Sequence, residues 1–132
     1  MKLSYFLYAE DDDEDVVILK EALRYKKGLS DLISVPNGFD LLTFLQEIKK
    51  NQSYPNLIIL DLQLPRLSGL ETLRLLKSDD MYRLIPVMVF AGSITHTEME
   101  SCNLLGADVM LKPSESRGWN QVVSKMCAYI DE

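Results

Sequence analysis

Short apolar runs alternate with amphipathic stripes along the whole chain. Five runs have the length and composition of strands, at residues 3–9, 32–35, 57–60, 85–90 and 107–111. Runs with few polar residues at alternate positions are typical of strands that are covered on both faces. The clearest run is the aliphatic stretch Leu57–Leu60, which follows the turn-forming pair Pro55 and Asn56. The pattern therefore predicts a buried sheet.

Helical spacing follows four of the five runs, with apolar residues recurring at intervals of three and four. The stripes comprise Val16, Leu19 and Leu23; Leu41, Phe44, Leu45 and Ile48; Leu70, Leu73 and Leu76; and Trp119, Val122, Val123, Met126 and Ile130. Two helix starts have the spacing of a capping box, Ser68 with Glu71 and Thr95 with Glu98. The second box predicts the remaining helix, between the fourth and fifth strands.

Five successive strand–helix units predict an α/β fold. Strict alternation favours a parallel sheet with helices on both faces, joined by right-handed crossovers. Five strands are too few for a closed eightfold barrel, so we expect a doubly wound (flavodoxin-like) five-stranded parallel sheet of order 2-1-3-4-5 with five helices. In such a sheet the ligand crevice lies beyond the carboxyl ends of strands one and three. The residues that follow these strands are therefore the first candidates for chemistry.

Composition restricts the classes to which this chain can belong. At 132 residues, with 47% apolar and 26% charged residues, we expect one globular domain over residues 1–132 and no output domain. No apolar stretch is long enough to span a membrane. We also expect no secretion signal, because the apolar start of the sequence is short and acids follow it at once. The net charge of -6 argues against direct nucleic-acid binding. The two cysteines, Cys102 and Cys127, have no metal-ligand spacing and suit a reducing cytoplasm.

Acidic residues follow the first and third predicted strands. Glu10 and Asp11 begin a run of six acids directly after the first strand, and Asp61 follows the third. Because these strands are neighbours in the predicted order, their carboxylates should face one another across the crevice. A simpler interpretation of Asp61 alone is a turn former. We interpret residues 13–15 as solvated charges at the start of a helix.

Converging carboxylates repel one another unless a cation joins them. An all-oxygen ligand set completed by water favours Mg²⁺, which also takes phosphate oxygens. Beside a metal, Asp61 can attack phosphorus and become an aspartyl phosphate. Lys112, which precedes Pro113 at the end of the fifth strand, would place an ammonium near the phosphate oxygens, although a surface lysine before a turn is the simpler interpretation. A cis Lys112–Pro113 bond is a further hypothesis, which would direct the lysine inward.

The ordered set of motifs resembles the receiver domain of bacterial two-component response regulators, most closely the stand-alone, chemotaxis-type class. The resemblance covers essentially the whole chain. It rests on the acid pair, on residues 61–69 (DLQLPRLSG) as the phosphoacceptor loop, on 85–90 (IPVMVF) as the fourth strand, on 105–107 (LGA) as the approach to the fifth, and on Lys112-Pro113. Each motif alone is common, but the order and spacing make the set specific.

The resemblance implies a role for each matching residue. Asp61 would accept a phosphoryl group from a phosphohistidine on a sensor histidine kinase or phosphotransfer protein. Asp11 would bind Mg²⁺ directly, Glu10 would bind it through water, and the backbone carbonyl of Gln63 would be a further ligand. Lys112 would pair with the phosphate. The metal-binding acid pair is either Glu10 with Asp11 or Asp11 with Asp12, and the predicted end of the first strand favours Glu10 with Asp11.

The sequence allows one leading functional interpretation and three alternatives. The leading interpretation is a phosphorylation-controlled module, with no enzyme activity beyond self-phosphorylation and autodephosphorylation, that binds an unknown downstream protein as a monomer or weak homodimer. A degenerate receiver that acts without phosphate is the main alternative. An aspartate-based phosphatase commonly has a second aspartate two residues after the nucleophile, where this chain has Gln63. A flavin or nucleotide binder would need a glycine-rich loop after the first strand.

Two positions depart from the family pattern. Where the family usually has Thr or Ser near the end of the fourth strand, this chain has Ala91. Where an aromatic residue often stands three positions before the lysine, it has Val109. The coupled threonine–aromatic switch is therefore expected to be absent. Ser93 could replace the missing hydroxyl if its loop is displaced. The favoured expectation is that Ser93 and Gln63 tune the access of the hydrolytic water.

Phosphorylation is predicted to survive these departures while its coupling to conformation is weak. Losing one hydrogen bond to a charged group costs about 1.5–3 kcal/mol. This loss shifts the active-state population by roughly ten- to a hundredfold but leaves the acid–metal chemistry in place. Backbone NMR shifts of the phosphorylated and unphosphorylated protein measure the coupling. Full activation, with another group donating in place of the missing threonine hydroxyl, would contradict the prediction.

Overall fold

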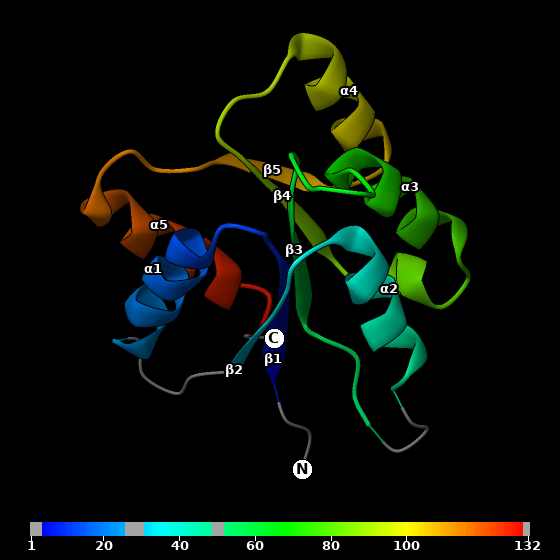
Figure 1. Cartoon of the computed structure of the whole chain (residues 1–132), viewed down its shortest axis with the longest axis horizontal. Coiled ribbons are helices and arrows are strands. Elements are labelled where there is room, and N and C mark those ends of the chain that lie inside the picture. The colour runs from blue at the N-terminus through cyan, green and yellow to red at the C-terminus, as the bar shows by residue number, and fades with distance from the viewer. Residues whose placement is uncertain (1–3, 26–30, 49–51, 131–132) are drawn as a thin grey trace.

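Five parallel strands form one sheet in the order β2-β1-β3-β4-β5, as predicted (Figure 1). The computed structural model describes residues 4–25, 31–48 and 52–130. The strands are β1 (Tyr5–Ala9), β2 (Asp31–Val35), β3 (Leu57–Asp61), β4 (Val87–Ala91) and β5 (Asp108–Leu111). The predicted doubly wound fold is thus confirmed.

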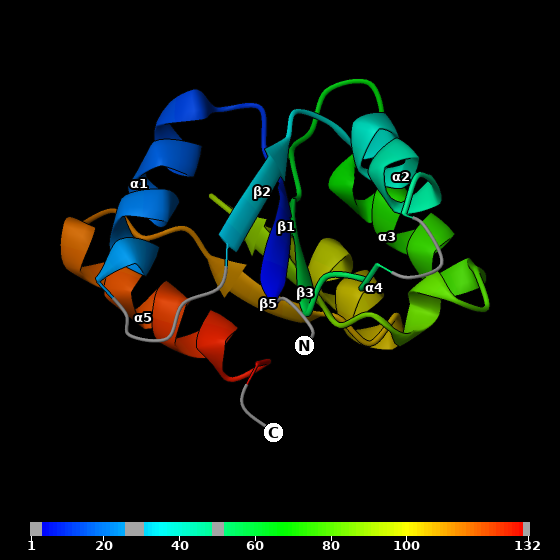
Figure 2. The same cartoon turned by 90° about the horizontal axis from the view of Figure 1, so that it is seen from below.

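The helices lie on both faces of the sheet. They are α1 (Asp13–Arg24), α2 (Gly38–Gln46), α3 (Gly69–Ser78), α4 (His96–Leu104) and α5 (Ser116–Cys127). Figure 2 shows α1 and α5 on one face and α2, α3 and α4 on the other. A short 3-10 helix, η1 (Tyr82–Leu84), joins α3 to β4. Among the described residues, no helix combines the length and the apolarity needed to cross a bilayer.

Alternate residues of each strand build two separate cores. Phe6 and Tyr8 of β1 pack with the buried stripes of α1 and α5, whereas Leu7 and Ala9 face α2 and its neighbours. Every residue of β3 is buried. The continuous apolar run of β3 is therefore explained by its central position, where both side-chain directions meet a covering layer.

Strand boundaries differ from the predicted ones by one or two residues. β4 begins at Val87 rather than at Ile85, because Pro86 has no N–H to donate to a neighbouring strand. β3 extends to Asp61, which is therefore the last residue of the strand and not the first of the loop. β1 begins at Tyr5, and the predicted start at residue 3 lies outside the described part of the chain.

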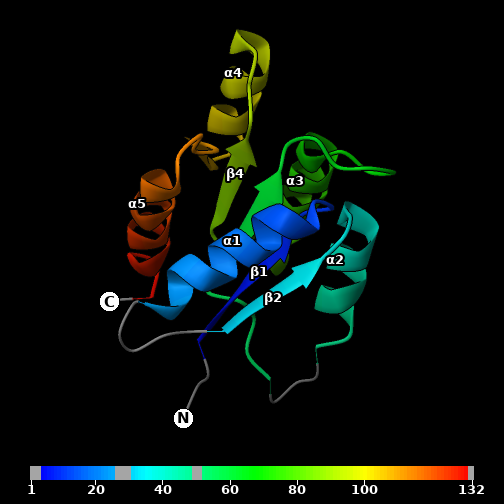
Figure 3. The same cartoon turned by 60° about the vertical axis from the view of Figure 1, so that its left-hand side comes forward.

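The carboxyl ends of the strands meet at a common edge of the sheet (Figure 3). The loops that leave this edge are fixed by helix caps. Both predicted capping boxes are present, with Ser68 and Glu71 at the start of α3 and Thr95 and Glu98 at the start of α4. Each box satisfies backbone N–H groups that a helix start otherwise leaves without partners.

The start of α3 lies directly against the end of β3. A Cβ atom on Gly69 would lie 2.2 Å from the carbonyl oxygen of Asp61 and 2.9 Å from the Cα of Leu62. The Gly69 N–H also donates to the Leu62 carbonyl oxygen at 3.2 Å. Only glycine permits this approach, so Gly69 determines where the backbone of Asp61 leaves the sheet.

Replacing Gly69 with alanine is predicted to lower the free energy of unfolding by about 1–3 kcal/mol, because the added methyl group forces backbone atoms apart. Gly92→Ala is the matched control, since nothing lies within 4 Å of the corresponding Cβ position. Urea denaturation of both variants measures the difference. A Gly69→Ala protein as stable as Gly92→Ala would show that the approach of α3 to β3 is not constrained.

Candidate functional site

Glu10, Asp11 and Asp61 come together at the carboxyl edge of the sheet. β1 and β3 are adjacent and pair Ala9 with Leu60, which brings the next residues, Glu10 and Asp61, side by side. Glu10 is 3% exposed and Asp61 is 4% exposed, whereas Asp11 faces solvent. One carboxylate oxygen from each of the three lies within 4.8 Å of the others.

Three hydrogen-bond donors hold the Glu10 side chain in place. Its Oε1 accepts a hydrogen bond from the Tyr8 hydroxyl at 2.9 Å and another from Lys112 Nζ at 2.7 Å, and its Oε2 accepts the Asp12 N–H at 3.2 Å. Burial raises the pKa of Glu10, the nearby Asp61 raises it further, and the hydrogen bonds from Lys112 and Tyr8 oppose the rise. The cost of burying the Glu10 carboxylate is thus offset by its hydrogen bonds from Tyr8 and Lys112.

Asp12 has a structural task that separates it from the acid cluster. It is the N-cap of α1, and its Oδ1 accepts the N–H groups of Glu14 at 2.9 Å and Asp15 at 3.4 Å. An N-cap aspartate also interacts favourably with the positive end of the helix dipole. The geometry therefore favours Glu10 with Asp11 as the acid pair.

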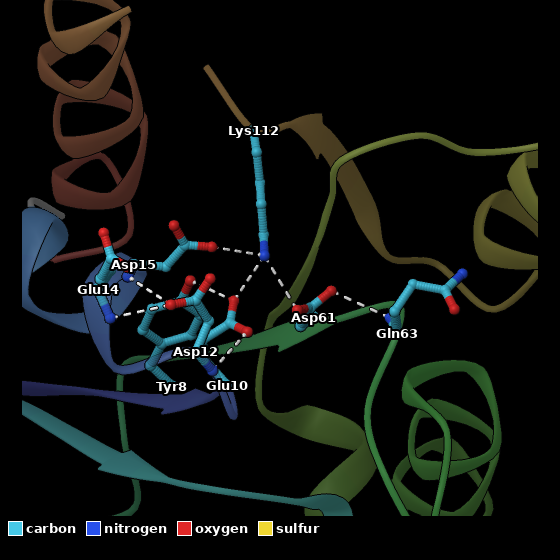
Figure 4. A network of polar contacts seen from close by, with 8 residues as sticks. All are labelled: Tyr8, Glu10, Asp12, Glu14, Asp15, Asp61, Gln63 and Lys112. Carbon is cyan, nitrogen blue, oxygen red and sulfur yellow. Dashed lines mark hydrogen bonds and ion pairs between the residues drawn. The ribbon is translucent and has the colours of Figure 1, made fainter. Parts of the chain in front are cut away.

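Lys112 lies at the centre of the site. Its backbone N–H donates to the Ala91 carbonyl oxygen at 2.7 Å, which extends the β4–β5 ladder by one residue. Figure 4 shows its Nζ pointing to the carboxylates of Glu10, Asp15 and Asp61, at 2.7, 2.8 and 3.0 Å. No peptide bond among the described residues is cis, so the hypothesis of a cis Lys112–Pro113 bond is wrong. The lysine reaches the crevice from a trans peptide.

The carboxylates fix the charge on Lys112. Burial disfavours the ammonium, but the hydrogen bonds to Asp15, Glu10 and Asp61 outweigh it and raise the pKa of Lys112 above its ordinary value. The ammonium also lies 5.9 Å from the centroid of the Phe90 ring. The ammonium form of Lys112 is consequently favoured by the acids around it.

Asp15 corrects the interpretation of residues 13–15 as solvated charges. Asp13 and Glu14 are exposed, but Asp15 has only 20% of its side chain exposed and forms an ion pair with Lys112. The sequence signal for this inward position is the spacing of Asp15 from the buried residues of α1. Asp15 lies one turn before Leu19 and two before Leu23, both buried, so it continues the inward stripe of α1 up to the sheet edge.

An aromatic row supports the site from the α1 and α5 side. The ring centroids of Tyr8 and Phe90 are 6.1 Å apart, and those of Phe90 and Trp119 are 5.4 Å apart in an edge-to-face arrangement. Trp119 is a packing residue, as predicted. Tyr8 is a core residue whose hydroxyl also donates a hydrogen bond to Glu10, and burial and the adjacent carboxylate raise the pKa of that hydroxyl.

The loop after β3 presents backbone to Asp61. The Gln63 N–H donates to Asp61 Oδ1 at 3.0 Å, while the Gln63 side chain is exposed and points away from Asp61 in Figure 4. A metal bond from the Gln63 carbonyl stays a prediction.

Ala91 and Val109, the two positions that depart from the family pattern, lie in β4 and β5. Ala91 is fully buried at the end of β4 and offers a methyl group to the α2–α4 core. Val109 is half-buried against the same core, and Ser93 is exposed in the loop that precedes α4.

The residues present fit a small hard cation. The three clustered acids offer only oxygen ligands, one of them facing solvent, which suits an ion that retains several waters. The carboxylate oxygens of Glu10 and Asp61 accept hydrogen bonds from Lys112 and from backbone N–H groups, which restricts the positions of these carboxylates. A site of this kind can hold a divalent cation beside one nucleophilic carboxylate and one ammonium.

Several known proteins are similar to this chain in sequence. The chain is 28% identical over 101 residues to protein PilG of Pseudomonas aeruginosa, covering 76% of this chain and 70% of PilG. It is 35% identical over 89 residues to response regulator Rcp1 of Synechocystis, covering 66% of this chain and 60% of Rcp1.

Solved structures give the same result over nearly the full length. The phosphorylated cyanobacterial phytochrome response regulator RcpA matches with a TM-score of 0.85 and 27% identity, covering 96% of this chain and 93% of RcpA. The Mn²⁺-bound form of Rcp1 matches with a TM-score of 0.84 and 26% identity, covering 96% and 94%. The family model of the response regulator receiver domain matches residues 6–123. The chain therefore belongs to the response regulator receiver domain family.

Proposed function

We propose that Asp61 accepts a phosphoryl group from a phosphohistidine on a sensor histidine kinase or phosphotransfer protein, in a reaction that requires Mg²⁺. The observation that carries the proposal is the position of the buried Asp61 carboxylate, which lies 3.0 Å from the Lys112 ammonium and close to the carboxylates of Glu10 and Asp11. This arrangement combines a nucleophile, a fixed cation and a cation site in one crevice.

The residues of the cluster share the tasks of this reaction, and Asp61 has two of them. A carboxylate oxygen of Asp61 attacks phosphorus, the phosphorus–nitrogen bond of the phosphohistidine breaks, and the imidazole leaves with the electron pair. Lys112 donates to an oxygen of the transferred group. Asp11 and Asp61 would hold the metal, with Glu10 acting through water and the Gln63 carbonyl as a further ligand. When bound, Mg²⁺ supplies neutralisation of the charge that develops on the phosphoryl oxygens.

Two proteins of similar structure support the proposal, because one is phosphorylated and the other binds a divalent metal ion. RcpA is described in a phosphorylated form and Rcp1 in a Mn²⁺-bound form, each at about a quarter identity to this chain. Mn²⁺ and Mg²⁺ share a preference for oxygen ligands. Because the three clustered acids of this chain are an oxygen set of the same kind, a divalent ion beside a phosphorylated Asp61 is the function that they fit best.

The product would act as a signal rather than as a released metabolite. We propose that aspartyl phosphate on Asp61 biases the surface formed by α4, β5 and α5 toward a downstream protein in the cytoplasm. Leu104 of α4 is 88% exposed and Leu111 of β5 is 56% exposed, so this surface offers apolar side chains to a partner. The absence of a hydroxyl at Ala91 favours a second candidate, a receiver that binds its partner without phosphate.

Incubation with acetyl phosphate and Mg²⁺ is predicted to add one phosphoryl group to the wild-type protein, detected by intact mass. Asp61→Asn removes the nucleophile and Asp11→Asn removes a metal ligand, so both variants should stay unmodified. A sample freed of metal with a chelator should also stay unmodified.

The control variant for this experiment is Asp13→Asn, which removes an exposed acid from the same run and should be phosphorylated like wild type. A folded wild-type protein that binds Mg²⁺ but gains no mass would refute phosphorylation and favour the phosphate-independent module. A gain of mass in Asp61→Asn would place the phosphoryl group on another residue.

A further inference from the structure

The Lys112 ammonium is fully engaged before any phosphoryl group arrives. An ammonium has three N–H donors, and here the acceptors are Glu10 at 2.7 Å, Asp15 at 2.8 Å and Asp61 at 3.0 Å. Glu10 and Asp61 belong to the proposed metal and phosphoryl chemistry. Asp15 has no place in that chemistry, yet it takes one of the three bonds.

The position of Asp15 is fixed by α1. Asp15 is the third residue of the helix, its N–H donates to the capping Asp12 carboxylate at 3.4 Å, and its side chain is 20% exposed. One turn further, Leu19 is fully buried against the sheet. Asp15 therefore reaches Lys112 as part of a packed helix and not as a freely rotating surface acid.

A phosphoryl group on Asp61 would need the same ammonium. Its oxygens compete with the Asp15 carboxylate for Lys112, and the Asp15 charge repels them at short range in a partly buried site, where screening is weak. Glu10, Asp11, Asp15 and Asp61 already set four formal negative charges against the one positive charge of Lys112. Asp15 thus adds negative charge at the place where phosphorylation of Asp61 would add further negative charge.

We propose that Asp15 is a positioning residue that holds Lys112 away from the phosphoryl group and thereby lowers the occupancy of the phosphorylated state. The proposal rests on the function proposed for Asp61. A purely supporting role for Asp15 gives the opposite expectation, because loss of support would loosen Lys112 and weaken the binding of an anion. The sign of the effect therefore distinguishes the two roles.

The test measures the affinity of the full chain for beryllium trifluoride, an anion that mimics a phosphoryl group on a carboxylate, in the presence of Mg²⁺. Asp15→Asn keeps the size of the side chain and an oxygen that accepts from Lys112, but removes the charge. We expect Asp15→Asn to bind the anion about tenfold more tightly than wild type, as followed by ¹⁹F NMR.

Two controls separate this effect from net charge and from folding. Asp13→Asn removes the same charge from an exposed position in the same helix turn and should stay within about twofold of wild type. Asp15→Glu keeps the charge and should return the affinity to near the wild-type value. Urea denaturation checks that each variant is folded.

Unchanged or weaker binding in Asp15→Asn, with normal Mg²⁺-dependent binding in wild type, would overturn the role of Asp15 and leave the proposed function intact. Equal tightening in Asp13→Asn would also overturn it, because net charge alone would then explain the gain. If no variant bound the anion with Mg²⁺, the role of Asp15 and the proposed function would both fail.

Discussion

The site depends on one electrostatic constraint, which is that four carboxylates gather at the edge of a buried sheet and must be compensated there. Lys112 provides this compensation by binding Glu10, Asp15 and Asp61, which come from the end of β1, the first turn of α1 and the end of β3. Lys112 itself follows β5, so one ammonium connects segments from both ends of the chain. Removing one partner from such a network leaves an uncompensated charge, which costs more than the intact pair contributes.

The fold makes this compensation possible by fixing backbones rather than side chains. The order of the sheet sets β1 beside β3, and the close approach of Gly69 to the Asp61 carbonyl sets where the loop after β3 begins. The cap that Asp12 provides directs α1 so that Asp15 faces inward. Below the acids, the Tyr8 hydroxyl gives Glu10 a partner that does not depend on solvent. The functional groups are thus held by the local structure of each connecting segment.

Much of this arrangement could be predicted from the sequence, because parallel strands end at a common edge. The apolar run Leu57–Leu60 placed β3 in the centre, and from there the meeting of Asp61 with Glu10 and Lys112 followed by topology alone. The inward position of Asp15 was not predicted, because a continuous run of acids gives no alternation of polar and apolar residues from which to read the buried face of a helix. Its spacing of four residues from Leu19 was the one sequence signal for that position. The hydroxyl bond of Tyr8 could not be predicted, since an aromatic residue in a strand does not indicate its polar partner. The 3-10 helix η1 is too short to show a period.

The free energy of unfolding of Lys112→Met in mildly alkaline buffer, measured without and with Mg²⁺, tests most directly whether Lys112 holds the acids together. Without metal, the variant should lose about 2–4 kcal/mol, somewhat less than a fully buried pair because Nζ is partly exposed. Added Mg²⁺ should recover much of this loss by supplying the missing positive charge. Lys20→Met, which removes an exposed lysine from α1, should change little in either buffer. A Lys112→Met protein that is as stable as wild type without metal would contradict the claim that this lysine holds the acids together.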